Sequence, residues 1–395
     1  YFYPDLPKGY QISMFEYPLI RGGSVGIETE NGKKSIRFNR IHLEEDAGKL
    51  IHIKRKHESH FDVNRCGVPL IEIVTEPDFE TPEEVYQFLN KLRELLVFSG
   101  ASKGNMFKGN IRVDANISIR PENQKELGTR SEIKNMNSFA NAVTAIRCEI
   151  HRQMDIVESG GTIVQETLLF NADNGTLSSM RIKEEAHDYR YFPEPDLVPV
   201  LVDDEWIAKI RSELPELRHE MRSRFESEYS IPAYDAEILT TSPDIAAYYE
   251  DVIRAGSNHK KASNWVMGEV MRVLNEKQID IREFNITPAM LSSLLLLIDK
   301  GVISGSVAKT IFEEMMKTGK TPDIIVKEKN LTQISDKGEL EKIVREIIES
   351  NPDEVASYKA GKTKVLGFLV GQVMKATKGK ANPKEANAII KEFLT

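Results

Sequence analysis

The stretch Ile41-His-Leu-Glu-Glu-Asp-Ala-Gly-Lys49 joins a predicted strand to a cluster of acids. The strand is indicated by the apolar residues Ile36, Phe38, Ile41 and Leu43. Glu44, Glu45 and Asp46 close it, and adjacent carboxylates repel one another unless a cation lies among them. Hard divalent cations, Mg²⁺ above all, prefer oxygen ligands and commonly accompany nucleotide phosphates. The stretch therefore favours a metal site, although a solvated acidic turn explains it equally well.

A second apolar run, residues 67–75, has an acid at its centre. Its sequence Gly-Val-Pro-Leu-Ile-Glu-Ile-Val-Thr predicts a strand buried on both faces, with Glu72 in the middle. A buried carboxylate is costly unless it meets a cation or a hydrogen-bond donor, so Glu72 is a candidate functional residue. The alternative is that Glu72 points to water while Ile71 and Ile73 face the core.

Two capped helices are predicted in the first half of the chain. Thr81, Pro82 and Glu84 form a strong helix start, and Ser138 begins a second, amphipathic helix. Lys134 and Asn135 lie at the mouth of the second helix, where backbone N–H groups can also meet an anion. We expect these two side chains to contact phosphate or carboxylate, with a simple helix entry as the alternative.

Residues 111–120 alternate between apolar and polar side chains, which predicts a half-buried strand. Its polar face carries Arg112, Asp114 and Asn116 and contains neither Lys nor Glu. That composition favours a polar ligand pocket over contact with bulk water.

Composition limits the class of protein. A chain of 395 residues with 40% apolar residues predicts two or three domains, and no apolar run is long enough to span a bilayer. Two cysteines provide no disulfide framework and no zinc spacing, which fits a soluble protein of the reducing cytoplasm. His52, His57 and His60 lie close together, but the intervening Lys54-Arg-Lys56 favours an exposed hairpin tip over a metal site.

The pattern of elements predicts an α+β protein. Strands and helices alternate over residues 1–212, helices alone follow over 213–325, and a small helical tail domain occupies 326–395. The net charge is −8, yet residues 355–384 contain no acid. The same interval contains Lys359, Lys362, Lys364, Lys375, Lys378, Lys380 and Lys384. This asymmetry favours RNA-phosphate contact over a merely solubilising helix end.

Several long motifs resemble the B subunit of the glutamyl/aspartyl-tRNA amidotransferases. They are the opening Tyr1-Phe-Tyr-Pro-Asp-Leu-Pro-Lys8-Gly-Tyr-Gln11, His42-Leu-Glu-Glu-Asp-Ala-Gly-Lys49, Asp62-Val-Asn-Arg65, Arg112-Val-Asp114-Ala-Asn116, Glu132-Ile-Lys134-Asn135 and Asp188-Tyr-Arg190-Tyr-Phe-Pro-Glu194. The resemblance implies a cradle-type catalytic domain that uses ATP and Mg²⁺. It also implies phosphorylation of the side-chain carboxylate of Glu-tRNA(Gln) or Asp-tRNA(Asn), followed by displacement with ammonia. In the family the partners are a glutaminase (amidase), known as the A subunit, and a small C subunit. An upstream segment carries a further Glu and His of the site.

On this resemblance we expect Glu45 and Glu72 to hold Mg²⁺. Glu44 and Asp46 are second-rank ligands or ammonia-orienting groups. His42, which lies beside the acids, orients a ligand or only caps the strand. The residues expected to contact ATP or the substrate are Lys8, Lys49, Arg65, Arg112, Asp114, Asn116, Lys134, Asn135 and Arg190. Two alternatives stay open, namely a tRNA-binding scaffold without chemistry of its own and the archaeal paralogue, known as the E subunit. The paralogue carries an additional inserted domain, which the direct passage from Asp196 into helices disfavours.

Overall fold

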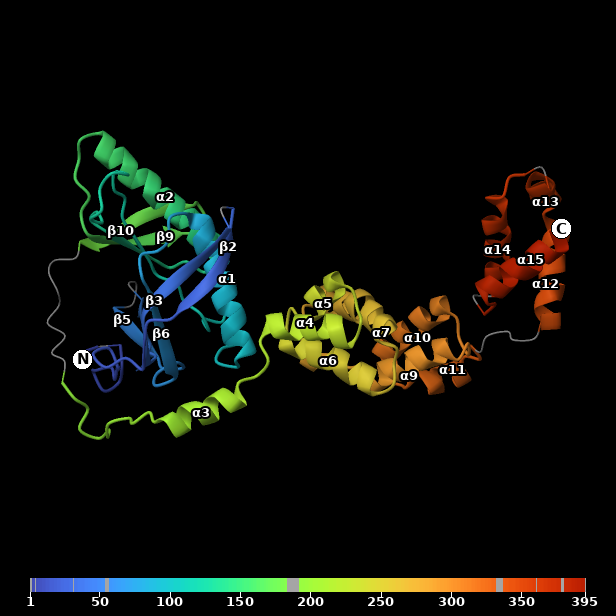
Figure 1. Cartoon of the computed structure of the whole chain (residues 1–395), viewed down its shortest axis with the longest axis horizontal. Coiled ribbons are helices and arrows are strands. Elements are labelled where there is room, and N and C mark those ends of the chain that lie inside the picture. The colour runs from blue at the N-terminus through green and yellow to red at the C-terminus, as the bar shows by residue number, and fades with distance from the viewer. Residues whose placement is uncertain are drawn as a thin grey trace. The chain divides into compact units, whose positions relative to one another are not determined.

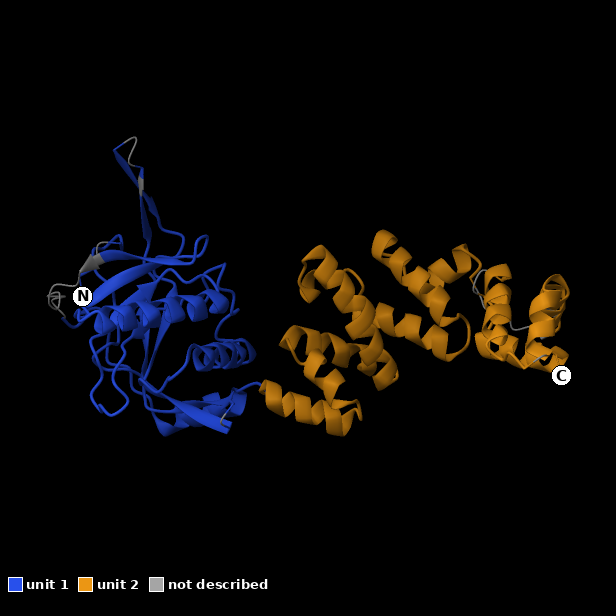
Figure 2. Cartoon of the chain, turned by 90° about the horizontal axis from the view of Figure 1, so that it is seen from above, with its two compact units in different colours: residues 1–216 blue, residues 217–395 orange. Residues whose placement is uncertain are grey.

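The computed structural model describes residues 2–3, 5–30, 32–53, 57–182, 192–331, 337–359, 361–377 and 380–394. The chain forms two compact units, residues 1–216 and 217–395 (Figure 2). Every described strand belongs to the first unit and the second unit is helical, so the predicted α+β class is confirmed. Within these described ranges no helix combines the length and the apolar character that a membrane crossing requires.

The long strand β3 (Gly32–Glu45) organises the first sheet of unit 1. It pairs antiparallel with β1 (Ile20–Arg21), β2 (Ser24–Thr29) and β6 (Pro69–Thr75). A second sheet has the order β10 (Thr176–Ile182), β9 (Glu166–Asn171), β8 (Ser131–Lys134) and β7 (Ala115–Ile117), with β8 and β9 parallel. Strands β4 (Lys49–Ile53) and β5 (Glu58–Asp62) form a separate hairpin.

Two helices cover the core of unit 1, and both begin where the sequence predicts (Figure 1). The Thr81 hydroxyl accepts a hydrogen bond from the Glu84 N–H at 3.2 Å at the start of α1 (Pro82–Phe98). Ser138 caps α2 (Phe139–Glu158) in the same way through Asn141. The core between the helices and the sheets contains Ile36, Phe88, Ile133, Ile146 and Phe170.

A β-bulge in β3 changes which side chains face this core. Phe38 pairs with Thr75, but Arg40 pairs with Val74, so β3 has one extra residue at this point. Neighbouring positions on β6 face opposite sides of the sheet, and therefore Phe38 and Arg40 do as well. Phe38 packs against the core, and Arg40, His42 and Glu44 point to the other face. The bulge thus converts one strand from a core element into the floor of a polar site.

Three predictions about unit 1 need correction. Strand β6 is not buried on both faces, because Ile71 and Glu72 are exposed. Only Ala115–Ile117 of the predicted strand 111–120 pairs as a strand, although less exposed and exposed side chains alternate from 111 to 117. A helix that the sequence pattern did not indicate, α3 (Asp204–Glu213), precedes the predicted start of the helical region.

Unit 2 has two separate hydrophobic cores. One joins the helices from α4 to α11, and its largest fully buried side chains include Phe225, Tyr249 and Phe312. The other joins the last four helices around Val344, Leu369 and Ile390. These two cores fit a helical region followed by a separate tail, but residue 325 lies within α11 (Pro322–Glu328), and Ile325 and Val326 both belong to the first core. The predicted division at 325 stays a prediction. The helices of unit 2 are α4 (Arg218–Glu228), α5 (Ala233–Leu239), α6 (Pro243–Arg254), α7 (His259–Trp265), α8 (Met271–Lys277), α9 (Pro288–Asp299), α10 (Gly305–Thr318), α11 (Pro322–Glu328), α12 (Lys337–Ser350), α13 (Pro352–Lys359), α14 (Val365–Ala376) and α15 (Pro383–Leu394).

Candidate functional site

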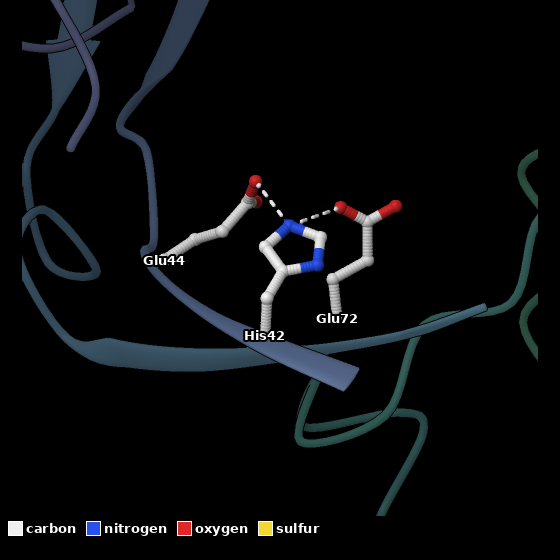
Figure 3. Close-up of side chains that lie close together, drawn as sticks. All are labelled: His42, Glu44 and Glu72. Carbon is white, nitrogen blue, oxygen red and sulfur yellow. Dashed lines mark hydrogen bonds and ion pairs between the residues drawn. The ribbon is translucent and has the colours of Figure 1, made fainter. Parts of the chain in front are cut away.

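Three side chains from β3 and β6 converge on the polar face of the first sheet (Figure 3). His42 lies directly opposite Glu72 in the register of the two strands, and Glu44 follows two residues later on the same face of β3. The His42 Nε2 atom is 3.1 Å from a Glu44 oxygen and 3.2 Å from a Glu72 oxygen. One ligand atom from each of the three residues lies within 4.8 Å of the others. This spacing allows one divalent cation to contact the group.

The N-terminal segment fixes Glu44 in place. Ser13 forms an antiparallel bridge with Glu44, and its hydroxyl donates a hydrogen bond to the Glu44 carboxylate at 2.8 Å. The Gln11 amide donates to the other carboxylate oxygen at 3.4 Å and to the Glu45 carbonyl at 2.6 Å. The ring of Phe15 packs edge-on against His42, with 6.0 Å between the ring centroids. His42 is fully buried under this cover, and its Nδ1 atom has no hydrogen-bond partner among the described residues.

Glu72 is the open side of the cluster. Its side chain is 46% exposed, whereas that of Glu44 is 11% exposed. Partial burial raises the pKa of the Glu72 carboxyl and the Glu44 carboxylate raises it further, while His42 and Arg40 oppose the increase. A cation bound here would remove the repulsion between the two acids. A ligand could approach the cluster from the Glu72 side.

The structure does not bring Glu45 into this group, contrary to the expectation that it would hold a metal with Glu72. Glu45 is one residue beyond Glu44 and therefore points to the opposite face of β3. There its carboxylate binds Lys8 and accepts a hydrogen bond from the Ile12 N–H at 3.0 Å. Lys8 is thus paired with Glu45 and contacts the ring of Tyr10. Together these contacts attach the N-terminal segment to the end of β3.

Asp46 joins two predicted ligand-binding arginines. Its side chain is buried, and one carboxylate oxygen accepts hydrogen bonds from Arg65 at 3.0 Å and from Arg112 at 2.7 Å. Arg65 also donates to the carbonyls of Lys108 and Gly109. Gly109 has φ +66°, and a Cβ atom there would overlap the Arg65 guanidinium. Asp46 is therefore a clamp that links the loops carrying Arg65 and Arg112, and it lies outside the group of His42, Glu44 and Glu72.

The predicted ligand residues of the second sheet form a smaller group. Lys134 binds Asp114 at 3.0 Å and Glu132 at 3.1 Å. Burial lowers the pKa of Lys134, but its two acid partners outweigh this effect and raise it. Asn116 is exposed on β7, as predicted for the polar face. Asn135 has a left-handed backbone, with φ 69°, and its amide donates to the Phe170 carbonyl at 3.1 Å.

The remaining predicted residues lie elsewhere. Lys49 is exposed at the start of β4, and Arg190 and Lys378 fall outside the described residues. His57 and His60 are exposed on the β4–β5 hairpin, where His60 pairs with Glu58, so the predicted hairpin is confirmed. Lys359, Lys362, Lys364 and Lys375 are exposed in the tail, and Lys380 is partly exposed there.

Sequence reasoning missed the contributions of Gln11, Ser13 and Arg40. Arg40 lies on the same face of β3 as His42, and its guanidinium carbon is 4.5 Å from the centre of the Phe15 ring. The sequence does contain a signal for Arg40, because Arg40 and Glu44 are each two residues from His42 and residues two apart on a strand share one face. Gln11 and Ser13 could not be found in this way, since only the tertiary fold brings them to β3.

Comparison with known proteins identifies the family. The model of the GatB/GatE catalytic domain matches residues 1–208, and that of the GatB domain matches residues 247–394. A protein of Thermoanaerobacter sp. (strain X514) is 55% identical over all 395 residues and is covered over 83% of its own length. A protein of Pelodictyon phaeoclathratiforme is 54% identical over 99% of this chain and 82% of its own length. A protein of Chlorobaculum tepidum is 51% identical over 100% of this chain and 83% of its own length. All three are named as the B subunit of an aspartyl/glutamyl-tRNA(Asn/Gln) amidotransferase. The chain therefore belongs to the family of aspartyl/glutamyl-tRNA amidotransferase B subunits, with a GatB/GatE catalytic domain in its first half.

Proposed function

We propose that this chain activates the side-chain carboxylate of Glu-tRNA(Gln) or Asp-tRNA(Asn) with ATP and then transfers ammonia to it. The observation that carries the proposal is the group of His42, Glu44 and Glu72 in the catalytic domain of a tRNA amidotransferase family. A free carboxylate is a poor acyl donor, so amidation needs an activation step before the nitrogen can attack. Phosphoryl transfer relies mainly on positioning and charge neutralisation, which a cluster of this kind can provide.

The proposed reaction has two steps. A carboxylate oxygen of the substrate attacks the γ-phosphorus of ATP, the bond to the bridging oxygen breaks, and ADP leaves. Ammonia then attacks the carbonyl carbon of the acyl phosphate, inorganic phosphate leaves with the bonding electrons, and the nitrogen loses a proton. The products are the amidated aminoacyl-tRNA, ADP and phosphate. We further propose that ammonia comes from a partner glutaminase, the A subunit, and that a small C subunit assists the transfer.

The donor set fits a divalent cation such as Mg²⁺. Glu44 and Glu72 offer the carboxylate oxygens that this ion prefers, while His42 would hold the two carboxylates through Nε2. Ser13 and Gln11 keep Glu44 oriented toward the cluster. When bound, the ion would neutralise charge on the transferring phosphoryl group. The proposed contacts for the anionic substrates are Lys134 on the second sheet and Arg112, which binds Asp46.

The tail supplies a separate proposed activity, binding of the tRNA body. Exposed Lys359, Lys362, Lys364 and Lys375 lie on or beside α13 and α14, in a chain whose overall charge is negative. A cluster of lysines binds phosphates with strong salt dependence and little base specificity. The tail has its own core, separate from the core of unit 1 that supports the His42, Glu44 and Glu72 group, so the proposed tRNA binding and the proposed chemistry use different folded bodies.

The test compares Glu44→Gln with Glu45→Gln in the full-length protein with its partner subunits. The two positions are adjacent and chemically identical, but they point to opposite faces of β3. We expect Glu44→Gln to reduce tRNA-dependent ATP hydrolysis by roughly 100-fold or more, equivalent to about 2.7 kcal/mol. Glu45→Gln should reduce it by less than about tenfold, because glutamine can still accept the hydrogen bond from Ile12.

Unchanged ATP hydrolysis by Glu44→Gln would contradict the proposal. If tRNA binding is retained at the same time, the scaffold alternative becomes the better account. A parallel measurement of amidation with Glu-tRNA(Gln) and with Asp-tRNA(Asn) assigns the substrate.

A further inference from the structure

Arg40 lies beside the cluster on the polar face of β3 and is partly buried, yet it forms no ion pair with a described carboxylate. Its Nη1 atom donates a hydrogen bond to the Asn39 side chain at 3.2 Å, and the Phe15 ring packs on its guanidinium group. Its Nε atom is buried and has no hydrogen-bond partner among the described residues. Burial raises the pKa of the Glu72 carboxyl, and Arg40 is one of the groups that oppose this increase. Arg40 is therefore a fixed positive charge close to Glu72.

Arg37, three residues earlier on β3, shows what an arginine of this strand can bind. Its Nε atom donates to one oxygen of Asp78 at 3.0 Å, and its Nη2 atom donates to the other at 2.7 Å. These two donors lie along one edge of the guanidinium plane and match the two oxygens of a carboxylate. The same edge of Arg40 donates to no described residue. A buried donor without an acceptor is destabilising, which favours a ligand that supplies the acceptor.

The charges at the cluster indicate which ligand this is. Glu44 and Glu72 carry two negative charges, which the proposed divalent cation would balance. The positive charge of Arg40 then remains, and no described carboxylate pairs with it. The side-chain carboxylate of the misacylated tRNA brings one negative charge, and amidation removes that charge. A carboxylate is also the group that Arg37 already binds on this strand.

We propose that Arg40 binds the side-chain carboxylate of the aminoacyl group on the tRNA and so distinguishes this substrate from its amide product. The inference rests on the proposed function, because it takes the misacylated tRNA as the substrate. The Nε and Nη2 atoms donate to the two carboxylate oxygens. Each oxygen has a second lone pair, so a bound carboxylate can still attack ATP. Since Nε is buried, the cover of the guanidinium group, to which the Phe15 ring belongs, shifts when the carboxylate binds.

The amide product fits this edge of Arg40 poorly. An amide offers one oxygen and one NH₂ group, and the NH₂ group would face a second donor instead of accepting from it. The product therefore loses one hydrogen bond and the whole charge interaction. Recognition of this kind favours binding of the substrate and release of the product.

The test measures binding without turnover. The full-length protein with its partner subunits is titrated with the misacylated tRNA and with its amidated form, in the presence of Mg²⁺ and without ATP or glutamine. The ratio of the two dissociation constants reports on the side-chain carboxylate, because both ligands share the tRNA body and the same fraction of folded protein. We expect the wild type to bind the amidated tRNA at least roughly tenfold more weakly.

Two variants of Arg40 and one matched control make the test specific. Arg40→Gln should bring the ratio to within about twofold of one, because it removes both the charge and the paired donors. Arg40→Lys keeps the charge but not the paired donors and should give an intermediate ratio. The control, Arg37→Gln, removes the bond to Asp78 on the same strand and should keep the wild-type ratio. Affinity for a non-hydrolysable ATP analogue should be unchanged in Arg40→Gln.

A wild-type ratio in Arg40→Gln, a ratio of one in the wild type, or an equal decrease in Arg37→Gln would overturn the proposal. Weaker binding of the ATP analogue by Arg40→Gln, at an unchanged ratio, would also overturn it and would assign Arg40 to the phosphates. The proposed chemistry is tested separately by ATP hydrolysis in Glu44→Gln. Because the binding ratio needs no turnover, either proposal can fail without the other.

Discussion

His42 and Glu72 face each other across the β3–β6 pair, with the His42 Nε2 atom 3.2 Å from the Glu72 carboxylate. Directly opposed residues on antiparallel strands share one face of the sheet. This pairing decides which acid of the Glu44-Glu45-Asp46 run belongs to the cluster. Glu44 lies on the same face of β3 as His42. Glu45 faces Lys8 instead, and Asp46 lies between two arginines.

The first prediction concerns cation binding. Replacing Glu72 by Gln removes the exposed carboxylate of the cluster and should weaken Mn²⁺ binding by roughly tenfold or more. Electron paramagnetic resonance of free Mn²⁺ measures the affinity directly, without any catalytic assay. Glu45→Gln is the control and should bind Mn²⁺ like the wild type. If the wild type, Glu72→Gln and Glu45→Gln bind Mn²⁺ with identical affinity, Glu72 does not belong to a cation site.

The second prediction concerns the Asp46 clamp. Asp46→Asn keeps the shape but leaves Arg65 and Arg112 without their shared negative partner. Both arginines are more than a third exposed, so we expect a loss of only about 1–3 kcal/mol in the free energy of unfolding. Urea denaturation followed by circular dichroism measures this loss.

Asp251→Asn is a suitable control for that experiment, because the Asp251–Arg254 pair is exposed on α6. Its cost should be below about 0.5 kcal/mol. A loss at Asp46 no larger than at Asp251 would show that the clamp does not stabilise the fold.

The third prediction concerns acid stability. Burial raises the pKa of Glu84, but the Glu80 N–H, the Lys34 ammonium and the Thr81 N–H outweigh it, so the net pKa is lowered from 4.5. A carboxyl group with a lowered pKa in the folded state stabilises the protein fully above its unfolded pKa. That contribution is lost as the pH falls through the folded pKa.

The stability advantage of the wild type over Glu84→Gln should therefore be constant from pH 7 to about pH 5 and should decrease below about pH 4.5. Thermal melts at a series of pH values, in buffers of equal ionic strength, test this expectation. If the stability advantage of the wild type over Glu84→Gln instead grows as the pH decreases, the pKa of Glu84 is not lowered in the folded state.

The fourth prediction concerns the tail. Removing three exposed lysines in Lys359→Ala/Lys362→Ala/Lys364→Ala should reduce the salt dependence of tRNA binding. Each lost phosphate contact lowers the slope of log affinity against log salt by roughly 0.7–0.9. Lys277→Ala/Lys300→Ala/Lys317→Ala removes the same charge from exposed positions outside the tail and serves as the control. Equal slopes for the two triple variants would place the RNA contacts elsewhere.

Much of the fold follows from local sequence patterns. The helix starts predicted at Thr81 and Ser138 are both present, because a capping side chain acts within three residues of itself. Helix α3 was missed although Asp203 caps it in the same way, because the extended Val-Pro-Val-Leu-Val run before it gives no helical period.

The candidate site was only partly accessible from the sequence. Glu44, Glu72 and His42 were recognised as candidates, but the choice of Glu45 as the partner of Glu72 needed the register of β3 and β6, which no local pattern specifies. Glu72 was expected to be buried because its neighbours are apolar, whereas Ile71 and Glu72 are both exposed on β6. In retrospect the apolar residues of β3 change from even to odd positions between Phe38 and Ile41. That change is the sequence signature of the bulge.

The bulge at Phe38 and Arg40 also has an evolutionary consequence. Removing Asn39 would restore regular alternation and would leave Arg40, His42 and Glu44 on their present face, because the extra residue has no partner position of its own on β6. Descendants of this chain can therefore lose one codon at this point of β3 without dismantling the cluster.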